Sequence, residues 1–382
     1  MRTRTVLVKL HLWIGLLVAP VLIVLGCTGA LLVLEEPMLD RVAAALTVVT
    51  PSGMPRSLDE WLASVRRTYP DAKPLGVQLP PDARHTAALT VALPNGDPTA
   101  VIVDPYTARV LGTEADQPQF FRRVRQLHRQ LLAGNAGALV VALCALALAV
   151  LAITGPAVWW PRRRIGVRWR LRGWRRMLDV HAAFGAVSWA FLLAFAVTGV
   201  IVHWDDATQK LIAAVTGTPS PRLPATAPAS CDGLTLGLDR LLAAGAGALP
   251  GARPTAIMLP RQGQPLARVT LKFPEDHTPN GRSMALIDPC TGVAAFTINT
   301  RRAPLAYLIP REWNREIHTG DIFGWPTRVL AWLFSLALPA MAITGPVVWL
   351  GRRRQRAASR SPARGERIVG RREAAGDLVP GD

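Results

Sequence analysis

Motifs of soluble enzymes and of covalent haem attachment are missing from this sequence. Its 382 residues include four cysteines and no CxxC or CxxCH motif, so thioredoxin-type chemistry and c-type haem attachment have no support. No HExxH motif, phosphate-binding loop, Ser/His/Asp signature or Gly-rich dinucleotide fingerprint occurs either. Hydrolysis and direct binding of NAD(P)H therefore lack recognisable residues.

Acidic residues are also scarce, with 26 Asp and Glu against 44 Lys and Arg and a formal net charge of +18. Most of the excess positive charge lies in three segments, residues 1–9, 161–178 and 351–382. Each segment adjoins a long apolar run, which is the positive-inside pattern of cytoplasmic loops rather than a nucleic-acid surface. We therefore expect no nucleic-acid partner and place both chain termini in the cytoplasm.

Four apolar runs are long enough to cross the roughly 30 Å hydrocarbon core of a bilayer. They cover residues 10–34, 136–160, 180–204 and 327–350. The first run, of about 25 residues, exceeds the apolar region of a signal peptide and lacks a clear cleavage site, so we interpret it as a retained span. The pattern predicts a multi-pass α-helical membrane protein with a four-helix core embedded in the lipid bilayer.

The segments between the spans then alternate between two sides of the membrane. The expected cytoplasmic segments are residues 1–9, 161–179 and 351–382, and the expected external ones are residues 35–135 and 205–326. In a bacterial inner membrane the external side is the periplasm. Each external segment contains short apolar runs bounded by Pro, Asn, Asp or Gly, and in the first one a helix is expected to open at Ser57. Each is predicted to be a small α+β module.

The two halves of the sequence resemble each other. AKPLGVQLP at residues 72–80 recurs as ARPTAIMLP at residues 252–260, and IVDPYTARVLG recurs as LIDPCTGVAAF. His11 and His181 each stand 17 residues before a Thr-Gly pair, and His128 and His318 each stand 26 residues before a Thr-Gly-Pro motif. These matches predict an internal two-fold repeat whose copies share one orientation, with the symmetry axis along the membrane normal.

Five of the seven histidines border the spans, and ionisable residues at membrane depth often mark function. The repeat would place His11 opposite His181 near the cytoplasmic surface and His128 opposite His318 near the external one. Paired neutral imidazoles on facing helices are suitable axial ligands for haem iron. The outer pair would lie about 16 Å beyond the membrane core if each helix were continuous. His203 has no counterpart in the first half and is either a third outer residue or a replacement for one of that pair.

Four further residues near these histidines have two interpretations each. Gly15 and Gly185 follow His11 and His181 by four residues on the same helical face. They either leave a slot for a flat porphyrin ring or let two helices approach closely. Arg125 and Arg315 precede the outer histidines by three residues. They either pair with haem propionates or an anionic substrate, or are solvated interfacial charges.

The four cysteines divide by location. Cys27 and Cys144 fall within spans and are expected to act as small apolar residues. Cys231 and Cys290 share the second external segment. A disulfide between them is plausible in an oxidising compartment, with two free thiols as the alternative.

Several of these stretches together resemble the PepSY-associated transmembrane family, over about residues 5–355. They are the opening LHLWIG at residues 10–15, the two ITGP endings followed by VWW or VWL, the DPxT turns and HTGDIFG from His318. The resemblance implies a four-helix core holding two b-type haems, which passes electrons to ferric iron or a ferric siderophore in the periplasm. His11 and His181 would serve the inner haem, and His128, His318 and His203 the outer one. RQLLAGNAG follows His128 where TGDIFGWPT follows His318, so the outer site departs from strict symmetry.

The electron donor expected for such a protein is a quinol or a cytoplasmic reductase, since no dinucleotide site is visible. Two other classes remain open at this point. A non-catalytic PepSY membrane sensor would bind a periplasmic partner and hold no haem. A transporter would use the histidines as a Zn or Cu pathway, although the spans lack the interior carboxylates that usually accompany one.

Overall fold

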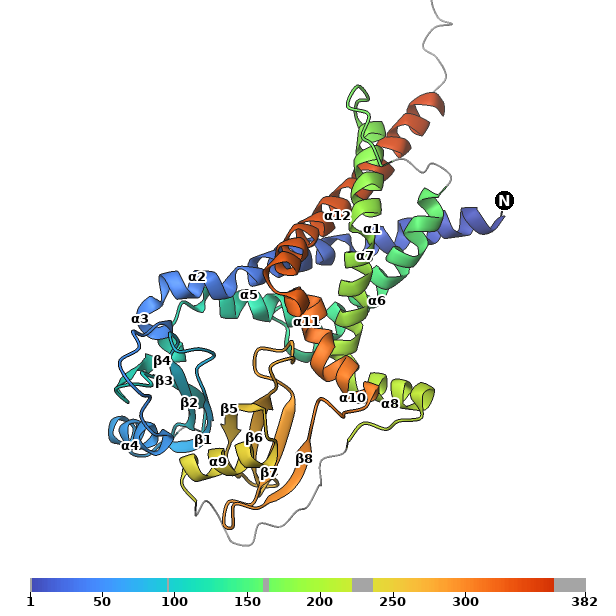
Figure 1. Ribbon diagram of the computed structural model, residues 1–382. Helices are drawn as coiled ribbons and strands as arrows, with labels where there is room; N and C mark the ends of the chain where they lie inside the picture. The colour runs from blue at the N-terminus through green and yellow to red at the C-terminus, as the bar shows by residue number, and fades with distance from the viewer. Residues whose placement is uncertain (1, 95, 161–164, 222–235, 361–382) are drawn as a thin grey trace, which may run out of the picture.

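A computed structural model describes residues 2–94, 96–160, 165–221 and 236–360. Figure 1 shows two parts, a group of long helices and a sheet domain at one end of that group. The long helices are α1 (Arg2–Val33), α6 (Gly134–Trp159), α7 (Trp174–His203) and α12 (Trp325–Arg360). The N-terminus and the last turns of α12 both lie on the side of the helices away from the sheet (Figure 1).

The four long helices are long and apolar enough to cross a membrane. The shortest, α6, has 26 residues, which span about 39 Å at 1.5 Å per residue. Helix α1 packs against α6 and α12, and α7 packs against the same two helices. Helices α1 and α7 are therefore diagonal partners in a four-helix core, and so are α6 and α12.

An apolar cluster fills the middle of this core, built from Val18, Leu22, Cys144, Leu148, Leu192, Ala196 and Leu338. Large apolar side chains on the outer faces of the helices are exposed, such as Leu17, Ile153 and Val187. A helix that is apolar on all sides suits a core that faces lipid. Helices α1 and α12 approach closely at Gly26, where an added Cβ would lie 2.4 Å from Cδ of Pro339, so a glycine is needed there.

The two external segments join in one antiparallel sheet of eight strands, in the order β4-β3-β2-β1-β5-β6-β7-β8. The strands are β1 (Lys73–Gln78), β2 (Ala87–Ala92), β3 (Pro98–Val103), β4 (Val110–Thr113), β5 (Arg253–Met258), β6 (Ala267–Lys272), β7 (Ser283–Ile287) and β8 (Ala294–Ile298). The halves meet where β1 pairs with β5, with Val77 opposite Ile257. The two external segments therefore share one sheet and one core.

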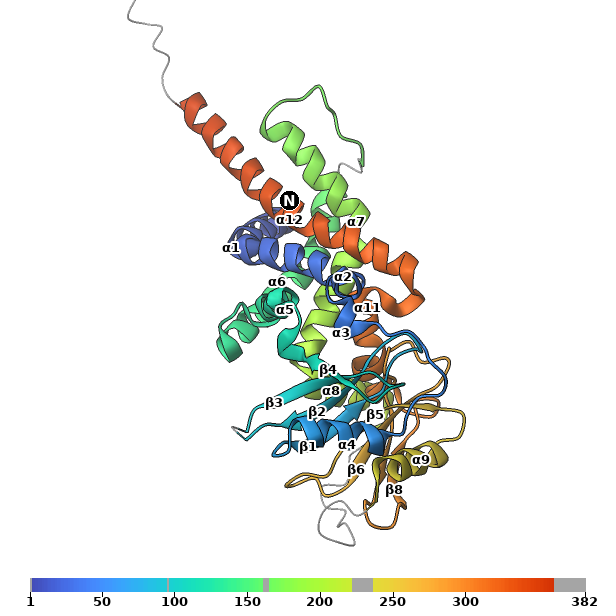
Figure 2. The ribbon, with the colours of Figure 1, turned by 90° about the vertical axis from the view of Figure 1, so that its left-hand side faces the viewer.

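Two helices, α4 (Leu58–Thr68) and α9 (Leu238–Ala248), pack on the sheet and on each other below the long helices (Figure 2). Ser57 begins α4 as expected, since its Oγ accepts a hydrogen bond from the N–H of Glu60 at 3.2 Å. Each helix also receives a cap from the other half. Asp239 accepts from the N–H of Leu58 at 2.9 Å, and Asp59 accepts from the N–H of Leu238 at 2.8 Å. The core beneath them includes Trp61, Val65, Leu89, Val101, Val269, Leu271 and Ile287.

Short helices connect the sheet to the spans and carry the outer histidines. In the first half they are α2 (Glu35–Val42), α3 (Ala44–Thr47), the 3₁₀ turn η1 (Glu114–Asp116) and α5 (Gln119–Gln130). In the second half they are α8 (Asp205–Thr216), α10 (Leu305–Leu308), the π-helical turn η2 (Ile309–Trp313), α11 (Asn314–Thr319) and the 3₁₀ turn η3 (Asp321–Phe323). Helix α5 packs on α1 and α6, and α11 packs on α7.

Neither outer histidine lies on an extension of a long helix. Leu131 and Leu132 have φ values of 49° and 58°, so the chain leaves α5 in the left-handed region and turns before α6 begins. Gly320, with φ of 82°, ends α11 in the same conformation, which favours glycine. These turns fold both short helices back onto the long ones, and the height of about 16 Å expected for continuous helices does not apply.

Candidate functional site

Four histidines each bond to a threonine of a long helix in the same half of the chain. The threonine is the first residue of a Thr-Gly pair, and all four threonines are buried. The Nδ1 to Oγ1 distances are 2.9 Å for His11 to Thr154, 2.9 Å for His128 to Thr28, 2.9 Å for His181 to Thr344 and 2.7 Å for His318 to Thr198. Every Thr-Gly pair that the sequence comparison aligned therefore holds one imidazole.

The glycine that follows the threonine leaves room for the ring in three of the four cases. An added Cβ would lie 3.3 Å from Cε1 of His128 at Gly29, 3.7 Å from Cε1 of His11 at Gly155 and 3.6 Å from Cε1 of His181 at Gly345. At Gly199 the nearest atom is Cβ of Ala145, at 3.2 Å. We call each threonine with its following glycine an imidazole seat.

The outer histidines, His128 and His318, come together from the two halves, with ring centroids 6.3 Å apart. A metal lies about 2 Å from an imidazole nitrogen, and the ring radius adds about 1 Å. Two rings holding one metal between them would therefore have centroids about 6 Å apart. Burial lowers the pKa of both His128 and His318 to about 4. The nearby His318 contributes to the lowering of the pKa of His128. Both rings are neutral near pH 7, which is the form that binds metals.

The inner histidines, His11 and His181, lie on the diagonal helices α1 and α7, within electrostatic range of each other. Among the described residues no ring-to-ring contact joins them. Their seats lie on α6 and α12, the two helices between them. The region near the inner ends of α1 and α12 is aromatic, since the rings of Trp13 and Trp349 meet edge to face with centroids 6.3 Å apart.

The glycines beside the inner histidines have neighbours within their own half. An added Cβ at Gly185 would lie 3.1 Å from Cε of Met341, and one at Gly15 would lie 3.8 Å from Cδ2 of Leu151. The first distance is tight and the second is an ordinary contact. Close helix approach therefore explains Gly185, whereas the surroundings of Gly15 place no steric demand on it.

The ring contact that the structure shows for His203 is with Trp204 and not with the outer pair. Its side chain is exposed, and its ring packs edge-on against Trp204 with centroids 4.8 Å apart. The arginines before the outer histidines also point to other partners. Arg125 forms an ion pair with Glu35, and Arg315 forms one with the adjacent Glu316 at 2.9 Å. Both guanidinium groups are about half exposed, which is typical of interfacial charges.

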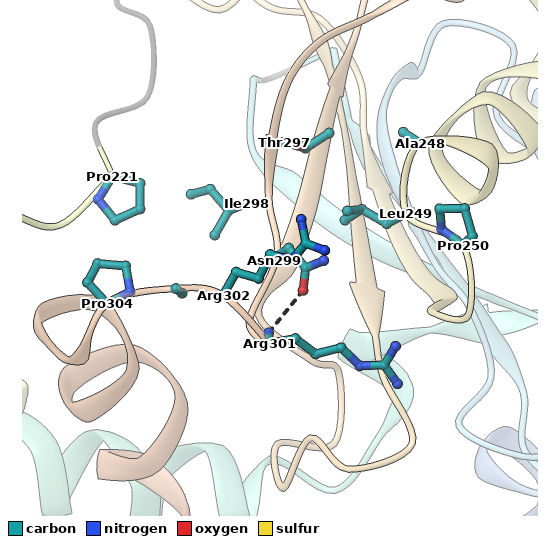
Figure 3. A pocket seen from close by; sticks show the side chains of 11 residues that line it. Pro221, Ala248, Leu249, Pro250, Thr297, Ile298, Asn299, Arg301, Arg302 and Pro304 are labelled. Carbon is teal, nitrogen blue, oxygen red and sulfur yellow. Dashed lines mark hydrogen bonds between the residues drawn. The ribbon is translucent and has the colours of Figure 1, made fainter.

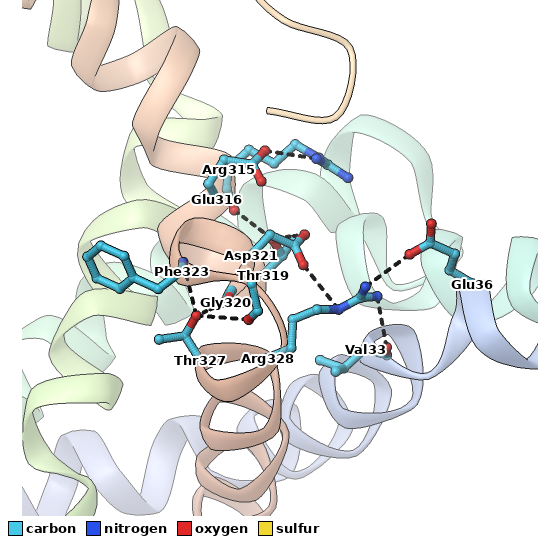
Figure 4. Close-up of polar contacts among 11 residues, drawn as sticks. Val33, Glu36, Arg315, Glu316, Thr319, Gly320, Asp321, Phe323, Thr327 and Arg328 are labelled. Atoms are coloured by element: carbon cyan, nitrogen blue, oxygen red, sulfur yellow. Dashed lines mark hydrogen bonds and ion pairs between the residues drawn. The ribbon is translucent and has the colours of Figure 1, made fainter. Parts of the chain in front are cut away.

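The polar contacts beyond His318 were not visible in the sequence (Figure 4). Arg328 of α12 pairs with Asp321 at 3.0 Å and with Glu36 of α2 at 3.0 Å, and it donates to the carbonyl of Val33 at 3.4 Å. The arginine thus joins the turn after α11 to the end of α1. Its matching position in the first half is Ala138, so no repeat pattern pointed to it.

The threonine partners were also missed, although their signal was present. The fixed spacings from histidine to Thr-Gly were interpreted only as marks of duplication. The recurring threonines were candidate partners for the four histidines, because a hydroxyl within a long apolar run needs a partner. The spacings did not show which pairs form, since Thr28 bonds His128 and Thr154 bonds His11, not the histidine 17 or 26 residues before it. Cys231 lies outside the described residues, so the disulfide between Cys231 and Cys290 stays a prediction.

A cleft of about 650 Å³ lies at the edge strand β8, in the sheet domain (Figure 3). Its lining includes Asn299, Arg301 and Arg302. The guanidinium of Arg301 is already paired with Glu275 and lies 4.0 Å from the ring centroid of Phe273. None of the four seated histidines lines this cleft. Among the described residues there is also no group of three or more His, Cys, Asp or Glu side chains that could hold a metal.

Four spans, a sheet domain at one end of them and four seated histidines together define a polytopic membrane protein with histidines within and beside its helical core. The model of the family "PepSY-associated TM region" matches residues 8–352. The chain belongs to this family, which confirms the resemblance drawn from its motifs. No curated protein matches the sequence.

Proposed function

We propose that this protein is a di-haem b electron-transfer protein of the bacterial inner membrane that reduces ferric iron or ferric siderophores on the periplasmic side. The observation that carries the proposal is the outer pair, in which imidazoles from two halves of the chain lie with centroids 6.3 Å apart. Each ring is bonded through Nδ1 to a buried threonine. The inner pair repeats these bonds on the diagonal helices.

The free nitrogens of these histidines support haem as the ligand. The bonds that join the four seated histidines to their threonines all run through Nδ1, which leaves Nε2 to bind a ligand. Coordination through Nε2 would leave each bond from Nδ1 to threonine intact. His11 and His181 would hold one haem, and His128 and His318 the other. His203 is assigned no ligand role, because its ring packs on Trp204.

Haem b at the two levels would supply one-electron carriers on either side of an apolar core. Electrons could then pass through a region that ions cannot cross. The chain orients two imidazoles at each level and separates the levels with the apolar cluster around Leu22 and Leu148. Each ferric ion gains one electron and becomes Fe(II), which hard oxygen ligands hold less tightly. A quinol would supply two electrons and release two protons, or a cytoplasmic reductase would supply one electron at a time.

The architecture supports two further parts of the proposal. The strand order, which runs outward from β1 and β5, and the reciprocal caps of Asp59 and Asp239 fit a duplicated unit with two PepSY-like modules. The arginine-rich segments next to the inner ends of the spans fit cytoplasmic termini and a periplasmic sheet domain. Arg125 and Arg315 are then surface charges near the outer site, available to an anionic ferric chelate after exchange of their carboxylate partners.

The test is an absorption spectrum of the full chain, purified in detergent after expression with ample iron and porphyrin precursor. We expect a b-type α band on reduction with dithionite and about two haems per chain by pyridine haemochrome assay. The reduced protein should be reoxidised by a ferric siderophore, with Fe(II) captured by a specific chelator. Colourless protein would contradict the proposal. Function that survives His11→Ala would then favour a PepSY sensor, and stoichiometric Zn or Cu binding would favour a transporter.

A further inference from the structure

The four imidazole seats also determine which ring nitrogen of each histidine carries the proton. We infer that each Thr-Gly seat fixes its histidine in the Nδ1–H tautomer and so presents the Nε2 lone pair, making Thr28, Thr154, Thr198 and Thr344 positioning residues. What binds at Nε2 rests on the proposed function, whereas the tautomer itself follows from the protein alone.

The number of hydrogen-bond donors at each seat determines the tautomer. A threonine hydroxyl has one hydrogen to donate and two lone pairs that accept. The hydroxyls of Thr28 and Thr198 lie 2.6 Å from the carbonyl oxygens four residues earlier. The hydroxyl of Thr154 lies 2.8 Å from the carbonyl oxygen of Val150, also four residues earlier. A carbonyl oxygen can only accept, so each hydroxyl hydrogen is used there.

The imidazole must then be the donor in the remaining bond. Oγ1 accepts from the ring, and Nδ1 must carry the hydrogen that it shares with Oγ1 at 2.7 to 2.9 Å. Thr344 follows the same scheme with a longer bond, 3.2 Å, to the carbonyl of Met341. We therefore expect the tautomer to be fixed least firmly at His181.

The glycine adds a steric part to the seat. It lets the Cε1 edge of the ring lie against the helix backbone, where at Gly29 an added Cβ would be only 3.3 Å away. Histidines that bind metals commonly donate their second N–H to a neighbouring acceptor, which fixes the tautomer and the ring orientation. A hydroxyl provides that acceptor without adding negative charge to an apolar core.

Without a histidine partner, the same threonines would be ordinary helix residues bonded to the preceding turn. The chain contains such a residue in Thr216, which is exposed and donates to the carbonyl of Ile212 at 2.8 Å. In the described part of the chain its other bond goes to Thr218 and not to an imidazole. Thr216→Val is therefore the matched control for Thr198→Val.

The experiment is ¹⁵N NMR of the histidine rings in the full-length, haem-free protein in detergent micelles, with signals assigned from single histidine variants. We expect a protonated Nδ1 and an unprotonated Nε2 for His11, His128, His181 and His318. Thr198→Val should convert the His318 signal alone to a mixture of tautomers, Thr198→Ser should restore it, and Thr216→Val should leave all signals unchanged. A protonated Nε2 in the wild type, or a His318 signal that ignores Thr198→Val, would overturn the inference.

The haem-loaded protein separates this inference from the proposed function. In Thr198→Val, loss of the bond between His318 and Thr198 should weaken outer haem retention by about 10- to 100-fold and shift the midpoint potential of that haem only. Protein that binds no haem but shows the expected tautomers would contradict the proposed function and keep the seats. Protein that binds two haems but shows Nε2–H tautomers in the haem-free state would support the proposed function and overturn the inferred tautomer.

Discussion

The two halves of the molecule hold their outer histidines in the same kind of seat but on different scaffolds. In the first half, His128 lies on the regular helix α5, and Gln126 beside it is exposed. In the second half, His318 follows the π-helical turn η2, and Glu316 at the matching position is fully buried. The shared part is the bond from imidazole to threonine. Both halves therefore retain the seat, while the segment that supports the histidine differs.

The different scaffolds reflect what each short helix must pack against. Glu312 in η2 accepts hydrogen bonds from the N–H groups of His277 and Thr278, in the chain between β6 and β7. The turn η2, which leads directly into α11, is therefore joined to the sheet domain by polar contacts of a buried side chain. The position matching Glu312 in the first half is Arg122, which is exposed. The second half thus links the outer site to the sheet more tightly than the first.

The largest expected effect tests whether the halves contribute equally to the outer site. His128→Ala and His318→Ala should each lower the haem content from about two to about one per chain, because one imidazole cannot replace a facing pair. The pyridine haemochrome assay measures this, with His85→Ala, outside the bundle, as the control. If one variant kept both haems, the two halves would not be equivalent and the pairing of His128 with His318 would be wrong.

The next effect concerns the contact that joins the halves of the sheet domain. Asp59→Ala and Asp239→Ala each remove the cap of the opposite helix, and each should cost about 1 kcal/mol of stability. Asp239 caps two N–H groups, those of Leu58 and Asp59, whereas Asp59 caps that of Leu238. Asp239→Ala should therefore cost more.

Denaturant unfolding of the full chain, followed by the fluorescence of its tryptophans, measures the cost of each cap. The double variant tests coupling, because each carboxylate lies beside the N-terminus that the other one caps. A cost for Asp59→Ala clearly above that for Asp239→Ala would show that the hydrogen bonds do not determine this contact.

The third effect tests the buried carboxylate that only the second half has. Burial raises the pKa of Glu316 above its ordinary value of 4.5, and the neighbouring Arg315 opposes that rise. The folded state then binds the proton more tightly than the unfolded state. This contribution to stability is complete below about pH 4.5 and is lost as the pH rises through the raised pKa.

Glu316→Gln removes that titration and makes the position resemble Gln126. Its thermal midpoint should exceed that of the wild type at pH 8, by an amount corresponding to about 1 kcal/mol, and fall less between pH 5 and pH 8. Burial also raises the pKa of Glu312, so part of the wild-type slope should remain. An unchanged slope in Glu316→Gln would show that Glu316 is not the group responsible.

The sequence predicted the parts of this structure that depend on local pattern. Apolar length located the four spans, and the helix at Ser57 followed from its cap. The pairing of β1 with β5 could not be predicted, because it joins residues about 180 positions apart. The pattern of short apolar runs indicates strands within each external segment but not which strands pair between the segments. The positions of His128 and His318 were also out of reach, since they depend on the left-handed turns at Leu131 and Gly320. Non-glycine residues adopt such turns too rarely for Leu131 to be a signal.

The smallest expected effect concerns the one span-bordering histidine without a counterpart. His203 ends α7, where its exposed ring packs on Trp204, and the matching residue in the first half is Val33. His203→Ala should therefore leave the haem content at about two per chain and the midpoint potentials unchanged, while stability changes by no more than about 0.5 kcal/mol. A lost haem would place His203 among the ligands and require α7 to move relative to α11. A shifted midpoint potential of the outer haem, with both haems retained, would instead mean that His203 acts on that haem through its electrostatic field. The extra histidine would then make the second half electrostatically different from the first.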